Sequence, residues 1–331
     1  MNYINNRFLL QKRPTGMPED NCWVMDSQKI TELQKQEILI KAEYLSIDPY
    51  MRGKMNDSIS YTPPLKIGEV MVGESVGTVI ESKSKNYAVG DLVTVHQGWQ
   101  TYIRTKDSDP SILKVPESKL NSSVFLGTLG MPGRTAYFGL NYVGNPQHGE
   151  TLVVSAASGA VGGVVGQLGK LIGCEVIGIA GGPKKSKYVT EELKFDQCID
   201  YKNENVVEKL EKYCPNGIDI YFENVGGEIT KMVSKFLNRN ARVPICGFIS
   251  KYNSTNIAGE ETPFHVLGAL NPKPKHRFFV VTEWLNQFEM ATSILHEHVK
   301  NEDIKFRETI TPGFENAPQG LRDVLSGKNF G

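Results

Sequence analysis

The sequence predicts an α/β fold in which a β-rich N-terminal region precedes a doubly wound parallel sheet. Residues 151–187 read as strand, Gly-rich turn, helix and strand, and strands continue to alternate with helices beyond them. This alternation is typical of a parallel sheet with helices on both faces. Residues 1 to about 125 instead carry short β-branched runs separated by Gly and Pro. A chain of 331 residues is long enough for two such domains.

The N-terminal region is expected to form a small curved barrel. Residues 37–44 alternate partly between apolar and polar, and residues 70–81 and 91–95 are apolar and β-branched. Glycines recur in this region at Gly68, Gly73, Gly77 and Gly90. That density of glycine indicates tight bends and close backbone approaches.

The region after residue 120 changes to alternating strands and helices. A helix is expected after Pro132, within residues 126–140. The expected strands are 151–155, 174–180, 196–201, 219–225, 241–247 and 278–282. The expected helices include 206–213, 287–300 and one that ends near Ile172, before Gly173. Strands and helices at this spacing predict a parallel, doubly wound sheet.

The turn after the first of these strands carries a nucleotide-binding pattern. Residues 157–162 (ASGAVG) are a variant of G-x-G-x-x-G with Ala in the first place. Small residues let the backbone turn tightly and approach a pyrophosphate, which then sits on the N-terminus of the following helix. The pattern is specific here because a strand precedes it and a helix and a second strand follow. The candidate cofactor-binding residues in the turn are Ala157, Gly159, Ala160, Val161 and Gly162.

The tip of the second strand indicates which dinucleotide binds. An NAD site usually places Asp or Glu about 20 residues after the glycines, where it holds the ribose 2′-OH. Residues 180–187 (AGGPKKSK) contain no acid and three lysines. Ammonium groups attract a 2′-phosphate, which a carboxylate would repel. The interpretation is an NADP(H) site, and the alternative is a solvated lysine cluster that begins a surface helix.

The bulk composition excludes several classes of protein. Lys plus Arg and Asp plus Glu number 37 each, which argues against broad binding to nucleic acid or an anionic membrane. No apolar run approaches the roughly 18 residues of a membrane-spanning helix, and the N-terminus lacks the apolar stretch of a signal peptide, so a cytoplasmic protein is expected. The five cysteines are scattered without a C-x-x-C pair, so neither a structural zinc site nor a disulfide framework is expected.

Several motifs together resemble a known superfamily. They are residues 46–52 (SIDPYMR), 91–93 (DLV), 129–137 (LGMPGRTAY), 156–162 (AASGAVG), 223–227 (ENVGG), 246–253 (CGFISKYN) and 313–316 (GFEN). Over essentially its whole length the chain resembles the zinc-independent double-bond reductases of the medium-chain dehydrogenase/reductase superfamily. These include prostaglandin and leukotriene reductases, plant alkenal reductases and bacterial curcumin-type reductases.

The resemblance implies a fold and a domain division. The fold is α/β, with a GroES-like β-barrel N-terminal domain plus a Rossmann doubly wound parallel sheet, and an active site in the cleft between the two. The implied domains are a GroES-like substrate and catalytic domain over 1–125, an NADP-binding Rossmann domain over 126–300 and a C-terminal segment over 301–331 that returns to the N-terminal domain. The implied assembly is a homodimer. Relatives usually continue past the position of Gly331 into a short strand, so the sequence is expected to stop short of that strand.

The positions that hold catalytic zinc in related alcohol dehydrogenases lack ligands in this chain. Residues 45–49 (LSIDP) contain no Cys, and Gly73 stands where the zinc enzymes have the His of a G-H-E motif. The six histidines form no ligand pattern with Cys and are interpreted as surface residues. Without Zn²⁺ no Lewis acid lowers the pKa of an alcohol, so reduction of a polarised C=C bond is the expected chemistry.

The resemblance also assigns roles to individual residues. Tyr252 is expected to donate a hydrogen bond to the enolate that develops during reduction, and Tyr50 to line the substrate or to donate as well. The alternative for each tyrosine is that it only packs, and the alternative for Asn224 is a plain turn former. The resemblance implies four further cofactor contacts. Asn224 contacts the nicotinamide side, Tyr201 lies near the adenosine phosphate, Lys185 binds the 2′-phosphate, and Asn329 contacts the cofactor from the C-terminal segment.

The expected activity is NADPH-dependent reduction of the C=C bond of α,β-unsaturated aldehydes or ketones, without metal. Hydride goes to the β-carbon, and the small-molecule partner is an enal or enone. One alternative is an NADPH quinone reductase of the same superfamily, whose partner is a quinone. The other is a non-catalytic NADPH-binding protein.

Overall fold

The computed structural model describes residues 3–57, 63–254 and 259–330. The chain divides into two compact units. Unit 1 comprises Met1–Leu126, Tyr252–Thr255 and Ile310–Asn329, and unit 2 comprises Gly127–Lys251, Asn256–Thr309 and Phe330–Gly331. Two segments from the second half of the chain therefore belong to the N-terminal unit.

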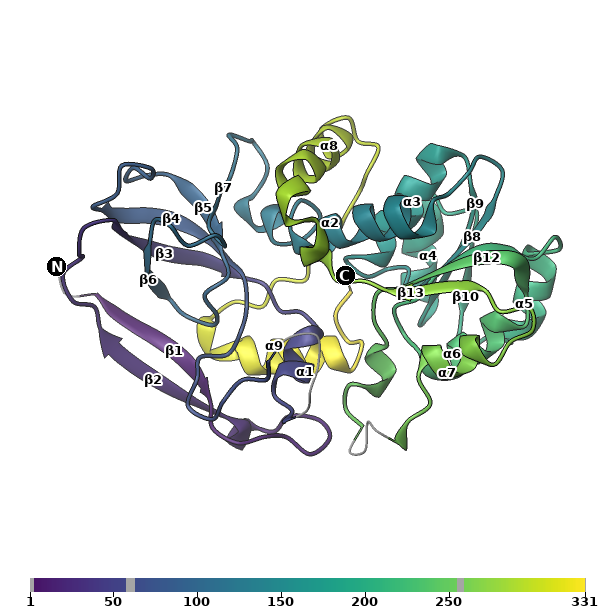
Figure 1. Ribbon diagram of the computed structural model, residues 1–331, viewed down its shortest axis with the longest axis horizontal. Coiled ribbons are helices and arrows are strands. Elements are labelled where there is room, and N and C mark those ends of the chain that lie inside the picture. Colours follow the sequence, from purple (N-terminus) through teal and green to yellow (C-terminus); the bar gives the residue numbers. More distant parts are fainter. Residues whose placement is uncertain (1–2, 58–62, 255–258, 331) are drawn as a thin grey trace. The chain divides into compact units, whose positions relative to one another are not determined.

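Unit 1 is built around an antiparallel five-stranded sheet in the order β6-β3-β4-β5-β7 (Figure 1). Its strands are β3 (Glu37–Leu45), β4 (Ser75–Ser82), β5 (Leu92–Val95), β6 (Tyr102–Lys106) and β7 (Leu113–Lys114). The register of β3 against β4 shifts twice, and such bulges bend a strand. At Gly77 of β4 a Cβ atom would lie 2.2 Å from the carbonyl oxygen of Lys41, so glycine is required there. The curved β-structure expected for the N-terminal region is confirmed.

The remaining elements of unit 1 build a second apolar core beside this sheet. They are β1 (Ile4–Leu10) and β2 (Trp23–Lys29), which pair antiparallel, with α1 (Tyr50–Lys54), α9 (Ala317–Leu325), η1 (Asp20–Cys22) and η7 (Phe314–Asn316), whereas η2 (Ser122–Phe125) contacts β4 of the sheet instead. Leu321 of α9 is fully buried in one cluster with Met51 of α1 and Trp99. Burial of these side chains holds the late segment 310–329 within unit 1.

Unit 2 contains a six-stranded sheet in the order β10-β9-β8-β11-β12-β13, and each neighbouring pair is parallel. Its strands are β8 (Thr151–Ser155), β9 (Glu175–Ala180), β10 (Gln197–Asp200), β11 (Ile218–Phe222), β12 (Leu237–Ile245) and β13 (Lys275–Phe278). The strand order runs outward from β8 in one direction and from β11 in the other. The order therefore reverses between β8 and β11, and ligands of such sheets bind outside the strand ends at this point.

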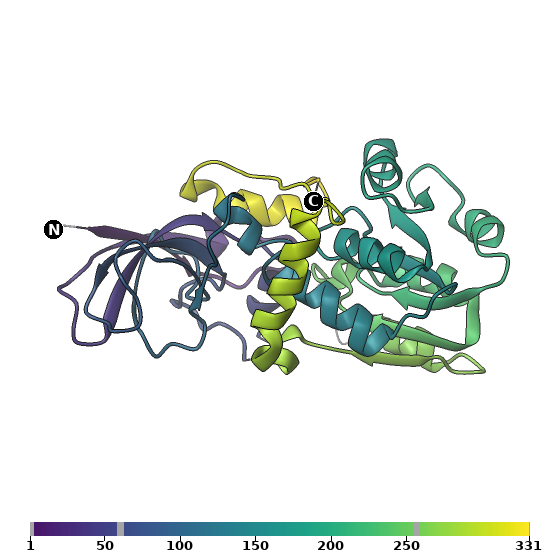
Figure 2. The ribbon, with the colours of Figure 1, turned by 90° about the horizontal axis from the view of Figure 1, so that it is seen from above.

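Helices cover both faces of the sheet of unit 2, as expected for a doubly wound fold. They are α2 (Met131–Phe138), α3 (Gly162–Ile172), α4 (Pro183–Glu191), α5 (Val206–Tyr213), α6 (Gly227–Ser234), α7 (Pro263–Gly268) and α8 (Phe288–Lys300), with η3 (Gly139–Gly144), η4 (Ile249–Lys251) and η6 (Val281–Gln287). Figure 1 shows α3 and α6 on opposite faces. Helix α8 packs against α2 (Figure 2).

The sixth strand lies earlier than the sequence indicated. Residues 278–282 (FFVVT) were expected to form it, but β13 ends at Phe278 and η6 begins at Val281. Phe279 is 2% exposed and its ring meets that of Phe222 edge-on, with centroids 6.0 Å apart. The apolar run therefore covers the sheet instead of extending it, and a short apolar run alone does not distinguish these two arrangements.

Two further expectations concern the cysteines and membrane-spanning helices. All five cysteines are free thiols in the structure. Among the residues that the structure describes, no helix combines the length and apolar character needed to cross a membrane.

Candidate functional site

The nucleotide-binding turn follows β8 and is held by main-chain contacts. The chain reverses at Ala156, whose φ is +51°. The N–H of Ala157 donates to the carbonyl oxygen of Ile179 on β9 at 3.1 Å, and that of Gly159 donates to Ala156 at 3.0 Å. A Cβ atom at Gly162 would lie 2.4 Å from the Ala156 oxygen, so only glycine fits where α3 begins.

The N-terminus of α3 is open to a ligand. Among the described residues, no side chain caps this end of the helix, whose preceding residue is Val161. The first N–H groups of a helix need acceptors, and together with the helix dipole they favour an anion. Ala157 is fully buried, whereas Ala160 is exposed at the rim of the turn. The turn therefore fits the pyrophosphate of a dinucleotide.

The three lysines after β9 occupy different environments. Lys185, in the first turn of α4, is half-buried, and burial together with the nearby Lys202 ammonium lowers its pKa. Lys184 is exposed, and Lys187 is exposed and pairs with Glu191 on the same helix at 3.6 Å. The alternative of a solvated surface cluster thus describes Lys184 and Lys187, and Lys185 is the lysine that faces a second cation.

Lys202 joins Lys185 at this position together with Tyr201. A Cβ atom at Gly181 would lie 2.8 Å from the ring of Tyr201 and 3.0 Å from Cε of Lys202. Both side chains therefore lie against the backbone at the tip of β9. Two ammonium groups beside an aromatic ring fit an adenosine 2′-phosphate. No role was predicted for Lys202 from the sequence, although its place directly after Tyr201, at the end of the third strand, was the available signal.

Asp200 stands two positions before Lys202, and its oxygens accept hydrogen bonds from neighbouring groups of the chain. It is 6% exposed and accepts from the N–H groups of Gly182 at 2.7 Å and Lys202 at 3.1 Å, and from the amide of Asn203 at 2.7 Å. Burial alone would raise its pKa, but these hydrogen bonds lower it below the ordinary value. Asp200 therefore stabilises the turns that carry the lysines, and it does not resemble the ribose-binding acid of an NAD site.

Asn224 lies at the end of β11, beside β8. Its amide Nδ2 donates to the carbonyl oxygen of Ser155 at 2.7 Å, and its N–H donates to Oγ of Ser155 at 2.8 Å. Ser155 is the last residue of β8, so Asn224 is joined to the strand that leads into the nucleotide turn. The reversal of strand order occurs between these two strands, which brings Asn224 to the expected ligand position.

Glu223 precedes Asn224 and shares Ser155 with it as a hydrogen-bond partner. Its carboxylate is fully buried, and Oε1 accepts from the N–H groups of Val225 at 2.8 Å and Gly226 at 3.0 Å and from Oγ of Ser155 at 3.2 Å. Its other oxygen accepts from the hydroxyl of Thr230. Buried carboxylates that receive several hydrogen bonds hold their surroundings rigidly. Glu223 was quoted in the sequence motif, but no role was predicted for it.

Both candidate catalytic tyrosines belong to unit 1. Tyr50, half-buried, begins α1, and its Oη lies 2.8 Å from Nε2 of His96. Tyr252 is half-buried and follows η4. The next residue, Asn253, accepts at Oδ1 from Nε of Arg52 at 3.1 Å, and Arg52 lies on α1 with 1% exposure. Arg52 therefore connects the segment that carries Tyr252 to the helix that carries Tyr50.

The remaining candidate is Asn329. It is half-buried and belongs to unit 1, whereas Ala157, Gly159, Ala160, Val161, Gly162, Lys185, Tyr201 and Asn224 belong to unit 2. Its expected cofactor contact stays a prediction. Within the part of the chain that the structure describes, no three side chains of the His, Cys, Asp and Glu types gather in a way that could hold a metal ion.

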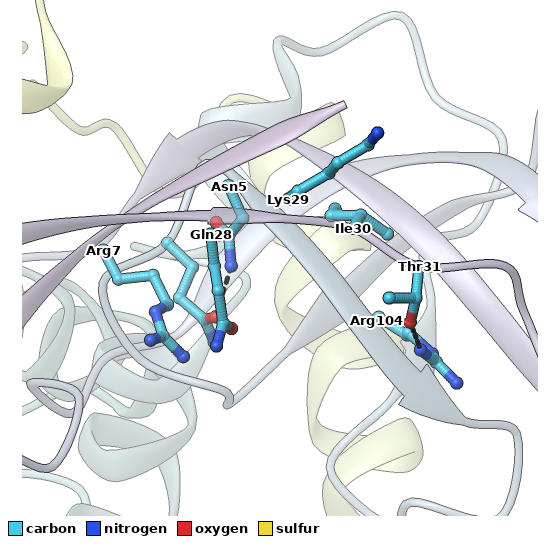
Figure 3. Close-up of a pocket in the computed structure, with 8 residues that line it drawn as sticks. Asn5, Arg7, Gln28, Lys29, Ile30, Thr31 and Arg104 are labelled. Carbon is cyan, nitrogen blue, oxygen red and sulfur yellow. Dashed lines mark hydrogen bonds between the residues drawn. The ribbon is translucent and has the colours of Figure 1, made fainter. Parts of the chain in front are cut away.

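A polar hollow of about 350 Å³ lies elsewhere on unit 1 (Figure 3). It is lined by Asn5, Arg7, Gln28, Lys29, Ile30, Thr31, Gln100 and Arg104. Arg7 pairs with Asp26, and Arg104 pairs with Glu37 at 2.6 Å. The hollow contains none of the expected site residues, and its arginines are occupied by carboxylates of the same unit.

Comparison with known proteins identifies relatives along the whole chain. Residues 6–113 match the family described as the N-terminal domain of oxidoreductase, and residues 160–284 match that described as zinc-binding dehydrogenase. The chain is 43% identical to the NADPH-dependent curcumin reductase of Escherichia coli (strain K12), over 99% of this chain and 95% of that protein. It is 37% identical to prostaglandin reductase 1 of Oryctolagus cuniculus, over 97% of this chain and 90% of the relative.

A solved structure is equally similar. The crystal structure of CurA from Vibrio vulnificus in complex with NADPH superposes with a TM-score of 0.92 and 41% identity, over 98% of this chain and 97% of that one. Identity at this level over nearly the full length of both chains shows common family membership. The chain therefore belongs to the zinc-independent double-bond reductase branch of the medium-chain dehydrogenase/reductase superfamily, as an oxidoreductase whose nucleotide site fits NADP(H).

Proposed function

We propose that this protein uses NADPH to reduce the C=C bond of α,β-unsaturated aldehydes or ketones, without a metal ion. The observation that carries the proposal is the pair of Lys185, in the first turn of α4, and Lys202, just after β10, with the Asp200 carboxylate accepting from main-chain N–H groups. This pair supports selection of a 2′-phosphate. The names of the curcumin and prostaglandin reductases that resemble the chain support a conjugated carbonyl compound as substrate.

Different residues bind the cofactor and stabilise the reacting substrate in this proposal. The N–H groups at the start of α3 hold the pyrophosphate, and Asn224, fixed by Ser155, presents its amide oxygen near the nicotinamide side. When bound, NADPH supplies the hydride that reduces the β-carbon of the substrate. Tyr252 donates a hydrogen bond to the oxygen on which negative charge develops, which stabilises the enolate. Tyr50 lies on the helix that Arg52 connects to the Tyr252 segment, and contacts the same substrate.

The proposal is tested by following NADPH oxidation with one acceptor at a time. The panel comprises short enals, long-chain enones, a diaryl enone and a quinone, and each acceptor is also tested with NADH. Turnover of enals or enones with NADPH, and much weaker turnover with NADH, supports the proposal. Product analysis must show a saturated carbonyl compound, because an allylic alcohol would mean reduction of C=O instead.

Two alternatives predict different results in the same panel. A quinone reductase would turn over the quinone and leave enones unreduced. A non-catalytic NADPH-binding protein would bind the cofactor, as seen by titration of NADPH fluorescence, but would not oxidise it with any acceptor of the panel. The cytoplasmic location and the homodimer are also proposals that come from the sequence resemblance, and cell fractionation and sedimentation analysis test them.

A further inference from the structure

Tyr50 and His96 form a hydrogen-bonded pair in unit 1. Oη of Tyr50 and Nε2 of His96 are 2.8 Å apart, and the two ring planes differ by 28°. The residues lie 46 positions apart in sequence, so the fold alone brings them together. The sequence pattern predicted only a surface position for His96, and neither the proposed hydride transfer nor the cofactor site uses it.

The pair extends from solvent toward the interior of unit 1. His96 is exposed, whereas Tyr50 is half-buried. The loop that carries His96 is held by hydrogen bonds. The main-chain N–H of His96 donates to Oγ of Ser111 at 3.2 Å, and the Ser111 hydroxyl donates to Asp109 at 2.8 Å. Asp109 also accepts from the side chain of Gln97. The imidazole is thus fixed against the phenol at one end and reaches water at the other.

The proposed reduction needs a proton as well as a hydride. Once the β-carbon has been reduced, the enolate must gain a proton at the α-carbon to give the saturated product. A phenol is acidic enough to protonate an enolate, and imidazole is the side chain that readily exchanges protons with water near neutral pH. With a protonated imidazole donating to Oη, the proton of the phenol is directed to a second acceptor.

We propose that His96, acting through Tyr50, is the relay that supplies this proton, an inference that rests on the proposed function. The C=C electron pair of the enolate forms a C–H bond at the α-carbon with the proton of Tyr50, and the O–H bonding pair stays on the phenol oxygen. The Nε2–H bond of the His96 imidazolium then breaks and its proton passes to that oxygen. Water returns a proton to the imidazole, so the net result is transfer of one solvent proton to the substrate.

The relay gives the two tyrosines separate roles. Tyr252 donates a hydrogen bond to the enolate oxygen and keeps its proton, whereas Tyr50 loses its proton to carbon and regains it from His96. Tyr50 is therefore the catalytic residue in this step, and His96 is a positioning and proton-supplying residue that never touches the substrate.

The test uses the variants Tyr50→Phe, His96→Ala and His96→Gln, with His148→Ala as the control. His148 is also exposed and lies in the loop before β8 of unit 2. The substrate is an enone with an α-methyl group, because its protonation creates a stereocentre. Tyr50→Phe should lower kcat by about 10²-fold and give both configurations at the α-carbon. His96→Ala should lower kcat and keep one configuration, since Tyr50 still delivers the proton, and the control should match the wild type.

Two further comparisons separate proton supply from a structural role. Imidazole added to the buffer should restore kcat of His96→Ala, because the site is exposed, and His96→Gln should stay slow because an amide does not transfer a proton. Recovery with Gln and no recovery with imidazole would show that His96 only holds Tyr50 in place. Retention of one configuration by Tyr50→Phe would overturn the assignment of Tyr50 as proton donor.

A measurement on the free protein distinguishes failure of the relay from failure of the proposed function. In protein labelled with ¹³C at Cζ of tyrosine, the Tyr50 resonance, identified by its loss in Tyr50→Phe, should shift when the pH is changed across the neutral range and lose this response in His96→Ala. If the Tyr50 resonance behaves alike in the wild type and in His96→Ala, the relay is overturned even if enones are reduced. A pH response of the Tyr50 resonance that requires His96, without turnover of any enone, overturns the proposed function, and with it the relay as a catalytic device.

Discussion

The side-chain amide of Asn224 donates to the carbonyl oxygen of Ser155 at 2.7 Å, and this hydrogen bond joins the segment just after β11 to the end of β8, where the strand order reverses. The bond uses the nitrogen of the amide and turns its oxygen away from Ser155. The buried carboxylate of Glu223 holds the following N–H groups and the hydroxyl of Ser155. The orientation of Asn224 therefore depends on Glu223, which does not itself reach the ligand position.

Glu223→Gln should weaken NADPH binding and lower stability together. An amide NH₂ group would face the N–H groups of Val225 and Gly226 or the Thr230 hydroxyl, and leaving a buried donor without an acceptor costs about 1–3 kcal/mol. We expect a roughly tenfold rise in the NADPH dissociation constant, measured by fluorescence titration, with a lower melting temperature. Glu228→Gln, whose side chain is 75% exposed on α6, is the control and should change neither quantity.

Lys185→Ala should discriminate between the two nicotinamide cofactors. Loss of one charge-assisted contact to a phosphate costs about 1.5–3 kcal/mol, so the NADPH dissociation constant should rise about tenfold or more while that of NADH stays nearly unchanged. Lys202→Ala should act in the same direction, because its ammonium lies close enough to affect the pKa of Lys185. Lys184→Ala, an exposed neighbour, is the control. Equal losses for NADPH and NADH would contradict the 2′-phosphate assignment.

Activity should not depend on a metal ion. The expectation rests on residues 45–49, which lack Cys, and on Gly73 in place of a ligand histidine. Prolonged treatment with a strong chelator should leave NADPH-dependent turnover intact, and elemental analysis of the active protein should find no stoichiometric zinc. A loss of activity that added Zn²⁺ restores would show that the chain uses a metal site that the sequence comparison did not reveal.

Tyr252→Phe should lower kcat more than it weakens NADPH binding. A phenol that donates only to the developing enolate stabilises the transition state, so its removal lowers kcat and kcat/KM together. Oxyanion donors are often worth about 10²-fold in kcat. Steady-state kinetics on an enone measure the effect, with Tyr142→Phe, an exposed tyrosine of η3, as the control. A change confined to KM would make Tyr252 a substrate-binding residue only.

Asp48 should make stability fall as pH rises toward neutrality. Burial, together with the Glu74 carboxylate, raises its pKa from 3.8 to about 7, although Ser46 donates a hydrogen bond to it at 2.6 Å. Between these two values the folded state holds a proton that the unfolded state has lost. The contribution of Asp48 to stability therefore declines as pH rises from about 4 to 7, by up to about 1.4 kcal/mol per pH unit, and levels off above that range.

Denaturant unfolding of the wild type and of Asp48→Asn at several pH values checks this expectation. The variant keeps the shape of the side chain but cannot ionise, so its stability should be flatter across the window and higher than that of the wild type near pH 7. Asp57→Asn, at a position with a 75% exposed side chain, should leave the pH profile unchanged. A difference in stability between Asp48→Asn and the wild type that stays constant between pH 4 and 7 would contradict the raised pKa of Asp48.

The fold and the nucleotide turn could be predicted because they depend on short-range patterns. The strand, the small residues of 157–162 and the helix after them are local in sequence, and a positive φ at Ala156 followed by the tight approach at Gly162 is the geometry they require. The absence of an acid at the tip of β9 is equally local. Strand limits were less accurate, as β13 shows, because an apolar run predicts burial more reliably than it predicts hydrogen bonding in a sheet.

Tertiary structure alone decided which side chains act together. No spacing in the sequence relates Tyr50 to His96, Asn224 to Ser155 or Arg52 to Asn253, and each pair is joined by a hydrogen bond across 46 or more positions. The family, the parallel sheet and the preference for a 2′-phosphate could be predicted from local patterns, because the small residues of the turn and the charges after the second strand lie in short, continuous segments. Packing between distant segments decides which lysine is half-buried, which carboxylate accepts main-chain hydrogen bonds and which histidine bonds to a phenol. Local patterns do not specify this packing.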